Sequence, residues 1–319
     1  MDTSKDASKY ADDVDSKLNR DAKNTTKNCD SAYLEIVKKI RKEGVWKDNR
    51  TGIRTLAIAG AMFEHEMGNG FPLLTTKKVA FKNIASELEF FIKGITDKSW
   101  LKERNNHIWD EWANPLKVPY SHDAETRRKM AEETDLGPVY GFQWRHFNAE
   151  YKDEKSDYRG KGVDQLNNLV EKLRKDPSDR RMIVSAWNPQ QVEMMALPPC
   201  HWGYQVTVIG DKLNLLWNQR SVDTMLGLPF NIASYGLLLH LLAKQANLKE
   251  GKLVGFLGDV HIYENHIEGA DEQLSRDVNK YASPHIRTEN FQDIFKWRSE
   301  DTKIEDYQSY PAIKFDIAV

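Results

Sequence analysis

Apolar residues recur at helical spacing in several segments of the chain, and these segments predict its main helices. The first segment begins at Asp30-Ser31, residue types typical of a helix N-cap, and ends at Gly44; its apolar face comprises Tyr33, Ile36, Val37 and Ile40. The second ends at Gly94 and has a stripe formed by Phe81, Ile84, Ala85, Leu88, Phe91 and Ile92. Helices are also predicted around residues 166–173 and 229–246. The last is apolar on all sides, so we expect it to lie at the centre of the molecule.

Runs of apolar residues with turn signals at their ends predict strands between these helices. Such runs cover residues 55–67, 182–187 and 253–260, and we expect residues 182–187 to form a buried strand. Residues 204–209 and 213–217 predict a hairpin, because Gly210-Asp211-Lys212 separates the two runs. Helices and strands are interleaved without a regular βαβ rhythm, which favours a single α+β or mixed-sheet α/β domain.

Polar stretches lie at the start of the chain and within it. Residues 1–29 are mostly Asp, Lys, Ser and Asn, so we expect a disordered leader before a folded domain at residues 30–319. Cys29 falls in this leader, and its replacement by serine is therefore expected to be silent. Residues 114–135 and 148–162 are interpreted as surface insertions of the domain, the first partly helical around residues 124–133.

Composition narrows the class of protein. The 319 residues are 40% hydrophobic, enough for a large core, and 46 Lys and Arg nearly balance 48 Asp and Glu. The chain therefore lacks the basic field of a dedicated nucleic-acid binder. No apolar run has the length of a membrane span, and the first residues are too acidic for a targeting peptide, so a cytoplasmic location is expected. Cys29 and Cys200 are too few for a disulfide framework or a structural zinc site, and no metal is expected.

The motif ALPPCH at residues 196–201 places a cysteine after two prolines that restrict the backbone. Such a cysteine is either a nucleophile or a buried, unreactive thiol, and the motif alone does not decide between them. A hydrolase-type pair of Cys200 and His201 is disfavoured, because adjacent residues on a strand point to opposite faces.

The motif QRSVD at residues 219–223 introduces charges beside apolar sequence. An arginine near Cys200 would lower the pKa of the thiol and could bind a phosphate through its forked donors, which makes Arg220 a candidate for both tasks. The alternative is a structural ion pair between Arg220 and Asp223. Further phosphate candidates, each of which could instead be a solvated surface charge, are Arg50, Arg180 and Arg181.

Groups suited to reading a ligand occur in two further motifs. Asn231 ends GLPFN at residues 227–231 and is either a helix cap or a ligand contact; its amide offers a donor and an acceptor that match the O4 and N3–H edge of uracil. In DVHIY at residues 259–263, His261 and Tyr263 share one face of a strand end and suit a sugar hydroxyl. A buried core histidine is the alternative for His261.

The order of these motifs resembles the thymidylate synthase family. The resemblance is carried by NRTG at 49–52, GFPLLTTKK at 70–78, IWDEWA at 108–113, LGPVYGFQWR at 136–145, DRRMIVSAWNP at 179–189, ALPPCH at 196–201, QRSVD at 219–223, LGLPFNIASY at 226–235, GDVHIYENH at 258–266 and the final PAIKFDIAV. It spans about residue 31 to Val319 and implies that family's fold, a large twisted mixed sheet flanked by helices, with two subunits packed sheet to sheet as a homodimer.

The resemblance implies a methyltransferase that converts dUMP to dTMP with 5,10-methylenetetrahydrofolate and releases dihydrofolate. Cys200 would add to C6 of the pyrimidine, which makes C5 a carbon nucleophile. The phosphate would be held by Arg50, Arg220 and Ser221, with Arg180 and Arg181 contributed by the second subunit of the homodimer. The other nucleotide contacts would be Asn231 at the uracil, His261 and Tyr263 at the ribose 3′-hydroxyl, and also Gln219 and Asp223.

The resemblance also implies a proton-transfer network and a folate site. Glu87, Tyr140 and His201 match residues of the family's proton and water network. Aromatic and apolar groups would stack the pterin while Asp223 accepts from its ring N–H groups, and the implied folate site comprises Ile108, Trp109, Trp112, Asp223, Phe230, Ala318 and Val319.

Departures from the family pattern leave the product open. Asn218 replaces a tyrosine, Trp202-Gly203 follow the Cys-His pair, and Ile53-Arg54 replace Thr-Gly after Gly52; we expect these changes near the nucleotide pocket. The alternative is a pyrimidine nucleotide hydroxymethylase, in which water replaces hydride as the last reactant. A dCMP substrate is disfavoured by Asn231. The near-neutral charge and intact cysteine disfavour a non-catalytic nucleotide- or RNA-binding protein of the same fold.

Overall fold

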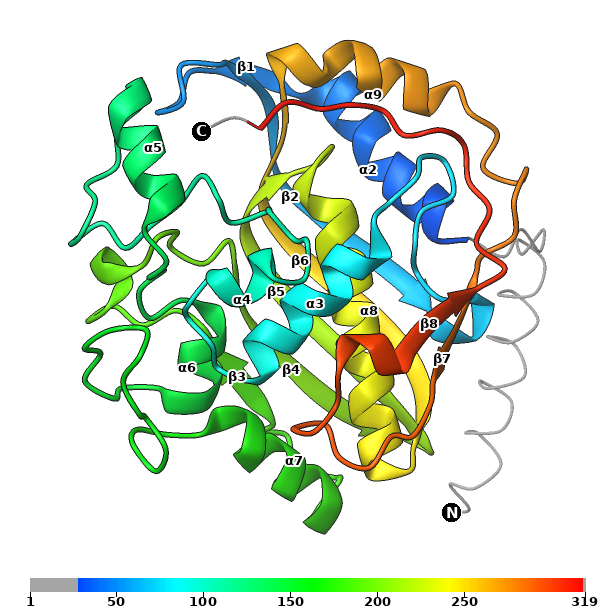
Figure 1. Ribbon diagram of the computed structural model, residues 1–319. Helices are drawn as coiled ribbons and strands as arrows, with labels where there is room; N and C mark the ends of the chain where they lie inside the picture. Colours follow the sequence, from blue (N-terminus) through cyan, green and yellow to red (C-terminus); the bar gives the residue numbers. More distant parts are fainter. Residues whose placement is uncertain (1–27, 318–319) are drawn as a thin grey trace, which may run out of the picture.

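A mixed β-sheet forms the centre of the structure, a computed structural model that describes residues 28–317 (Figure 1). Within these residues the sheet has six strands in the order β1-β2-β6-β5-β4-β3. Strands β5 and β6 pair in parallel and the other neighbours are antiparallel. The strands are β1 (Val45–Lys47), β2 (Thr55–Glu66), β3 (Ile183–Ser185), β4 (His201–Ile209), β5 (Lys212–Asp223) and β6 (Lys249–Tyr263). The α+β class and the hairpin at residues 204–217 are thereby confirmed.

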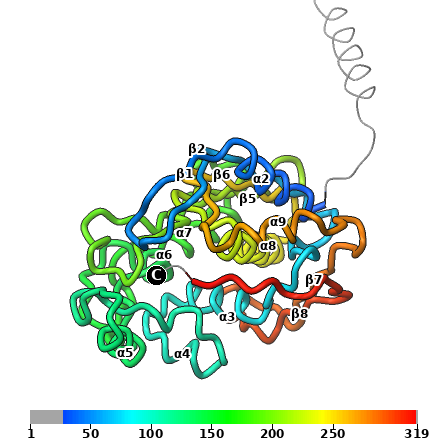
Figure 2. Tube along the Cα trace, turned by 90° about the horizontal axis from the view of Figure 1, so that it is seen from above, coloured from blue at the N-terminus to red at the C-terminus, as the bar shows by residue number. Residues whose placement is uncertain are grey.

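Helices cover one side of this sheet, and helix α8 (Gly227–Ala246) lies at the centre, as its all-round apolar sequence predicts. Figure 2 shows α8 between the sheet and helix α3 (Phe81–Ile92). A small antiparallel sheet, β7 (His285–Thr288) with β8 (Thr302–Glu305), completes the architecture. The remaining helices are α2 (Cys29–Glu43), α4 (Ser99–Lys102), α5 (Ala124–Glu132), α6 (Tyr140–His146), α7 (Gln165–Lys175) and α9 (Ile267–Leu274).

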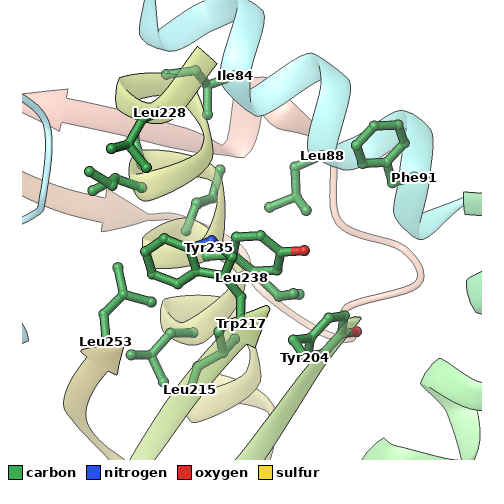
Figure 3. Close-up of a cluster of buried hydrophobic side chains, with 14 of the residues drawn as sticks. Ile84, Leu88, Phe91, Tyr204, Leu215, Trp217, Leu228, Tyr235, Leu238 and Leu253 are labelled. Atoms are coloured by element: carbon green, nitrogen blue, oxygen red, sulfur yellow. The ribbon is translucent and has the colours of Figure 1, made fainter. Parts of the chain in front are cut away.

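Aromatic side chains from β4, β5 and α8 interlock in the core (Figure 3). The rings of Trp217 and Tyr235 stack with centroids 5.4 Å apart, and Tyr204 contacts Tyr235 edge-on at 5.8 Å. Gly255 on β6 makes room for this packing, because a Cβ there would overlap the Trp217 ring. The close fit anchors β5, which carries Gln219 and Arg220 towards the site.

The start of α2 corrects the prediction for Cys29. Helix α2 begins at Cys29, and Asn28 is its N-cap, with Oδ1 accepting from the Ser31 N–H at 2.8 Å. The Cys29 side chain is 1% exposed and belongs to the hydrophobic core, so it does not lie in a disordered leader. Asp30 is buried and accepts instead from the backbone N–H groups and hydroxyls of Thr75 and Thr76. The rest of the predicted leader lies outside the described residues.

The two polar stretches differ from each other in structure. In the first, α5 forms where helix was predicted. In the second, Tyr151 and Tyr158 are buried against Phe142 of α6 and form a small core of their own, so residues 148–162 are only partly a surface insertion. The predicted buried strand at residues 182–187 is also wrong in part, because β3 is the edge strand of the sheet and Ile183 is 56% exposed. Within residues 28–317 every helix is too short or too polar to cross a membrane.

Candidate active site

A cavity of about 640 Å³ opens beside Cys200. Its wall comes from the loop between β1 and β2, the segment 112–120, the segment 187–200 and the ends of β5 and β6. Residues that lie far apart in the sequence and were predicted to act together meet here: Arg50, Trp112, Cys200, Arg220, Ser221, His261 and Tyr263. A chain with this arrangement can present a thiol to an anionic ligand.

The backbone of Cys200 is held on both sides of its peptide. Its N–H donates to the Tyr140 hydroxyl at 2.9 Å, and its carbonyl accepts from the Arg220 N–H at 2.8 Å. Cys200 comes directly before β4. Pro198 and Pro199 restrict the backbone ahead of it, and the hydrogen bond from the Arg220 N–H joins it to β5, so the direction of the thiol is fixed. The thiol therefore meets a ligand in a prepared position.

Burial is the largest effect on the pKa of the Cys200 thiol and raises this pKa above its usual value. The positive charges of Arg220 and Arg50 oppose the rise. The Arg220 side chain is fixed, because Nε and Nη2 donate to the carbonyls of Pro199 and Pro198 at 2.9 and 2.8 Å. Its ion pair with Asp223, the alternative interpretation, is not formed within the described residues. The arginine thus remains available both to the thiol and to an anion.

A tight turn presents Arg50 to the cavity. The Asn49 Oδ1 accepts from the Thr51 N–H at 2.9 Å and from its hydroxyl at 2.6 Å, and Gly52 takes a φ of 75° that favours glycine. The departure after Gly52 is accommodated outside the cavity, since Arg54 pairs with Glu264 and lies over the Trp46 ring. Arg50 itself is exposed at the tip of the turn.

Asn231, Gln219 and Asp223 form a polar group next to the cavity, although none of them lines it. Gln219 is buried and donates from Nε2 to the Asn231 Oδ1 at 3.0 Å. This contact fixes the amide of Asn231 with its Nδ2 donor available for a ligand. Asn231 is not a helix cap, because it lies inside α8, after the N-cap Leu226. Asp223 Oδ1 accepts from the N–H groups of Met225 and Leu226 just ahead of this helix.

His261 and Tyr263 project from the end of β6 into the cavity, as predicted from their alternation. The His261 ring is mostly buried, with Nδ1 3.0 Å from the Asp259 Oδ1, which leaves Nε2 to face a ligand. Burial is the main effect that raises the pKa of Tyr263, to about 12, so its hydroxyl remains a hydrogen-bond donor at neutral pH.

A second group of titratable residues lies behind the cavity. Trp109 Nε1 donates to Glu87 Oε1 at 2.8 Å, and burial raises the pKa of Glu87 to about 7. The His201 ring packs 4.4 Å from the Tyr140 ring, with Nδ1 2.9 Å from the Tyr235 hydroxyl, and burial lowers its pKa to about 3. His201 is therefore neutral and packs into the core, so it is not the base partner of Cys200.

Part of the predicted folate site lies at this cavity. Trp112 lines it and meets the Trp109 ring edge-on at 6.2 Å, while Ile108, Trp112 and Phe230 are half-buried apolar groups packed against the core. Such groups could cover a flat aromatic ring system. The predicted contacts of Ala318 and Val319 lie outside the described residues.

Arg180 and Arg181 lie apart from the cavity of their own chain. They precede the edge strand β3, and the Arg181 side chain is 83% exposed and pairs with Asp179. Sequence reasoning also missed residues that do line the cavity: Lys47, Pro115, Tyr120 and Trp187. Trp187 carries the Arg220 guanidinium over its ring at 5.4 Å, and the WNP motif was its only signal. Tyr120 lies in a polar insertion that gave no signal.

Two of the sequence departures lie on strands β4 and β5. Asn218 alternates with the inward-facing Trp217 and Gln219 and shares the opposite sheet face with its register partner Phe256. Trp202 is an exposed side chain of β4, and neither Trp202 nor Asn218 lines the cavity. These two departures therefore stand two positions from Cys200 and Arg220 without contributing to the cavity wall.

The cavity places a cysteine beside two arginines, and comparison with known proteins identifies the family of the chain. The family model described as thymidylate synthase matches residues 31–319. The chain is 44% identical over 301 residues to the thymidylate synthase of Homo sapiens, covering 94% of each protein. It is 43% identical over 295 residues to that of equine herpesvirus 2, covering 92% of this chain and 99% of the relative.

A third relative is the bifunctional dihydrofolate reductase-thymidylate synthase of Paramecium tetraurelia. It is 41% identical over 295 residues, and the chain spans 61% of its length. The chain belongs to the thymidylate synthase family, whose members use methylenetetrahydrofolate as co-substrate.

Proposed function

We propose that this protein catalyses the reductive methylation of dUMP to dTMP with 5,10-methylenetetrahydrofolate and releases dihydrofolate. The observation that carries the proposal is Cys200, which shares its cavity with Arg50, Arg220 and Ser221 in a chain of this family. Arginine side chains bind a phosphate through paired donors, and the same charges favour the thiolate that must attack the ring.

In the first step Cys200 Sγ forms a bond to C6 of the pyrimidine. The C5–C6 π electrons move to O4, and C5 becomes the nucleophilic carbon. Asn231 is positioned to donate from Nδ2 to O4, because Gln219 occupies its Oδ1. Later loss of the C5 proton and departure of Cys200 Sγ from C6 restore the double bond. Glu87, with a pKa of about 7, can hold or release a proton at neutral pH.

The groups beside the cavity fit the proposed co-substrate. Bound methylenetetrahydrofolate would supply the one-carbon unit and the hydride. Trp112 and the half-buried Ile108 and Phe230 would cover the pterin, and the Asp223 carboxylate would accept from its N–H groups.

The same proposal includes a homodimer that completes the phosphate site. One face of the sheet exposes Met62 and its register partner Phe256, and Ile183 on β3 and Trp202 on β4 are also exposed. An apolar face of this kind is suited to packing against a second copy. Arg180 and Arg181 come directly before the edge strand β3 and do not line the cavity of their own chain. In the homodimer they would reach the cavity of the partner subunit.

A single assay tests the proposed reaction. The protein is incubated with dUMP and methylenetetrahydrofolate, dihydrofolate is followed by absorbance, and the nucleotide product is identified by mass. We expect dTMP and dihydrofolate in equal amounts, no turnover with Cys200→Ser, and weak use of dCMP. Hydroxymethylated dUMP without dihydrofolate would show the alternative hydroxymethylase, and full activity of Cys200→Ser would refute the proposed nucleophile.

A further inference from the structure

We propose that Tyr120 is a positioning residue for Arg50 and that the insertion at residues 114–135 is the part of the active-site wall that presents it. The tyrosine ring covers one face of the Arg50 guanidinium and so directs its edge to the substrate phosphate. The inference rests on the proposed function, in which Arg50 binds the phosphate of dUMP.

The contact between the two side chains is direct. The Arg50 Cζ lies 5.6 Å from the centroid of the Tyr120 ring, and both residues line the cavity beside Cys200. Within residues 28–317, Arg50 forms no ion pair or side-chain hydrogen bond. A ring occupies only the face of a guanidinium, which leaves the five N–H donors at its edge for a phosphate. The contact can therefore orient Arg50 without competing with the ligand.

The base of the insertion is closed by hydrogen bonds. The Asn114 N–H donates to the Asp135 carbonyl at 2.7 Å, and Asn114 Nδ2 donates to the buried Asp135 Oδ2 at 3.0 Å. Lys117 Nζ lies 3.0 Å from the same Asp135 oxygen and 2.9 Å from Glu154 Oε2. Residues between these ends consequently leave and re-enter the domain at one fixed point.

A buried lysine fastens the insertion to the loop that carries Trp112. Lys98 is 1% exposed, and its Nζ donates to the Met130 carbonyl of α5 at 2.6 Å and to the Trp112 carbonyl at 2.7 Å. Burial lowers the pKa of Lys98, to about 8. One ammonium thus joins α5 of the insertion to the loop that carries Trp112, so Tyr120 is presented from a braced segment.

Substitutions of Tyr120 separate positioning from folding. With Tyr120→Ala we expect KM for dUMP to rise about two- to fivefold, the size of an exposed cation–π contact, with kcat and the KM for the folate unchanged. Tyr120→Phe should behave as the wild type, because the ring and not the hydroxyl covers Arg50. Arg128→Ala is the matched control, since Arg128 lies on α5 in the same insertion and forms an exposed pair with Glu132.

Binding measurements show whether the effect acts on the phosphate. Calorimetry with inorganic phosphate, dUMP and deoxyuridine should reveal weaker binding of the first two ligands to Tyr120→Ala and unchanged binding of deoxyuridine. Equal binding of phosphate to wild type and Tyr120→Ala, an equal loss for deoxyuridine, or a Tyr120→Phe defect as large as that of Tyr120→Ala would overturn the inference. Failure of the wild type to convert dUMP would refute the proposed function alone, because the phosphate titrations still test Tyr120.

Discussion

Glu87 illustrates how burial of one side chain controls a protonation state in this site. Among the residues that the structure describes, its carboxyl accepts one hydrogen bond, from Trp109 Nε1, and burial raises its pKa from the usual 4.5 to about 7. The folded protein therefore binds this proton more tightly than the unfolded chain does. The stability that results is fully present below about pH 4.5 and is lost as the pH rises through about 7.

Replacement by an uncharged isostere tests this linkage. Because Gln cannot ionise, Glu87→Gln should not lose stability in this way as the pH rises. The Tm of the variant minus the Tm of the wild type should therefore increase steadily from pH 5 to pH 8. The control is Glu132→Gln, in which the carboxylate is exposed. Thermal unfolding across this pH range measures the difference; parallel curves for wild type and Glu87→Gln would contradict the raised pKa.

At the residue scale, short motifs identified candidate groups that the folded chain brings to one cavity. Cys200 and Arg220 came from two motifs that the pairing of β4 with β5 joins, and His261 and Tyr263 came from the alternation at the end of β6. Tyr120 and Lys98 could not be found, since their importance depends on contacts with Arg50 and Trp112 that only the folded chain brings about. Alternation along β5 was visible in the sequence, but which face met the cavity was not.

At the scale of elements, the start of α2 shows why a boundary prediction failed. Asp30 is a residue type that caps helices, yet its carboxylate bonds to Thr75 and Thr76 across the molecule, and Asn28 performs the cap. The polar composition before Cys29 concealed the fact that the helix continues by one more residue into the core. Tertiary contacts therefore overrode the local preference.

The corrected position of Cys29 leads to a prediction that reverses the sequence-based one. Cys29→Ser places a hydroxyl among apolar neighbours, so we expect it to destabilise the protein by about 1 to 3 kcal/mol. Cys200→Ser, at the cavity, is the matched control and should unfold near the wild-type urea concentration. Burial raises the pKa of the Cys29 thiol well above its usual value, so a thiol reagent should label Cys200 first. Equal urea midpoints for the two variants would contradict the buried position.

Elements with a strong local pattern were predicted well, and those that depend on partners were not. Helix α8 and the hairpin of β4 and β5 follow from periodicity and a turn. The burial of Tyr151 and Tyr158 depends on Phe142 in another segment, and the edge position of β3 depends on strand order. Neither property can be read from spacing within the segment itself.

At the scale of the whole molecule, the position of Asn218 shows the limit of a local pattern. Asn218 shares the sheet face away from α8 with its register partner Phe256, and the proposed homodimer would cover this face. The sequence predicted a sheet-to-sheet homodimer through family resemblance alone. The alignment of Asn218 with Phe256 is a long-range register that no local pattern contains.

A subunit-mixing experiment tests the homodimer and the exchange of arginines together. If Arg180 and Arg181 serve the partner's site while Cys200 serves its own, a hybrid of Cys200→Ser with Arg180→Ala/Arg181→Ala has one site with both defects and one intact site. Random exchange of two inactive proteins should then recover up to about a quarter of wild-type activity, because half of the dimers are hybrids and half of their sites are intact.

The matched control replaces the arginine pair with Arg50, which lines the same cavity as Cys200 in one chain. A mixture of Cys200→Ser with Arg50→Ala creates hybrids in which every site carries one defect, so no activity should return. Recovery is measured as dihydrofolate formation after mild denaturation and refolding of the mixed subunits. If the first mixture stays inactive although native mass spectrometry shows hybrid dimers, Arg180 and Arg181 act within their own chain or not at all. If both mixtures recover activity, the assignment of Arg50 to the site of its own chain is wrong.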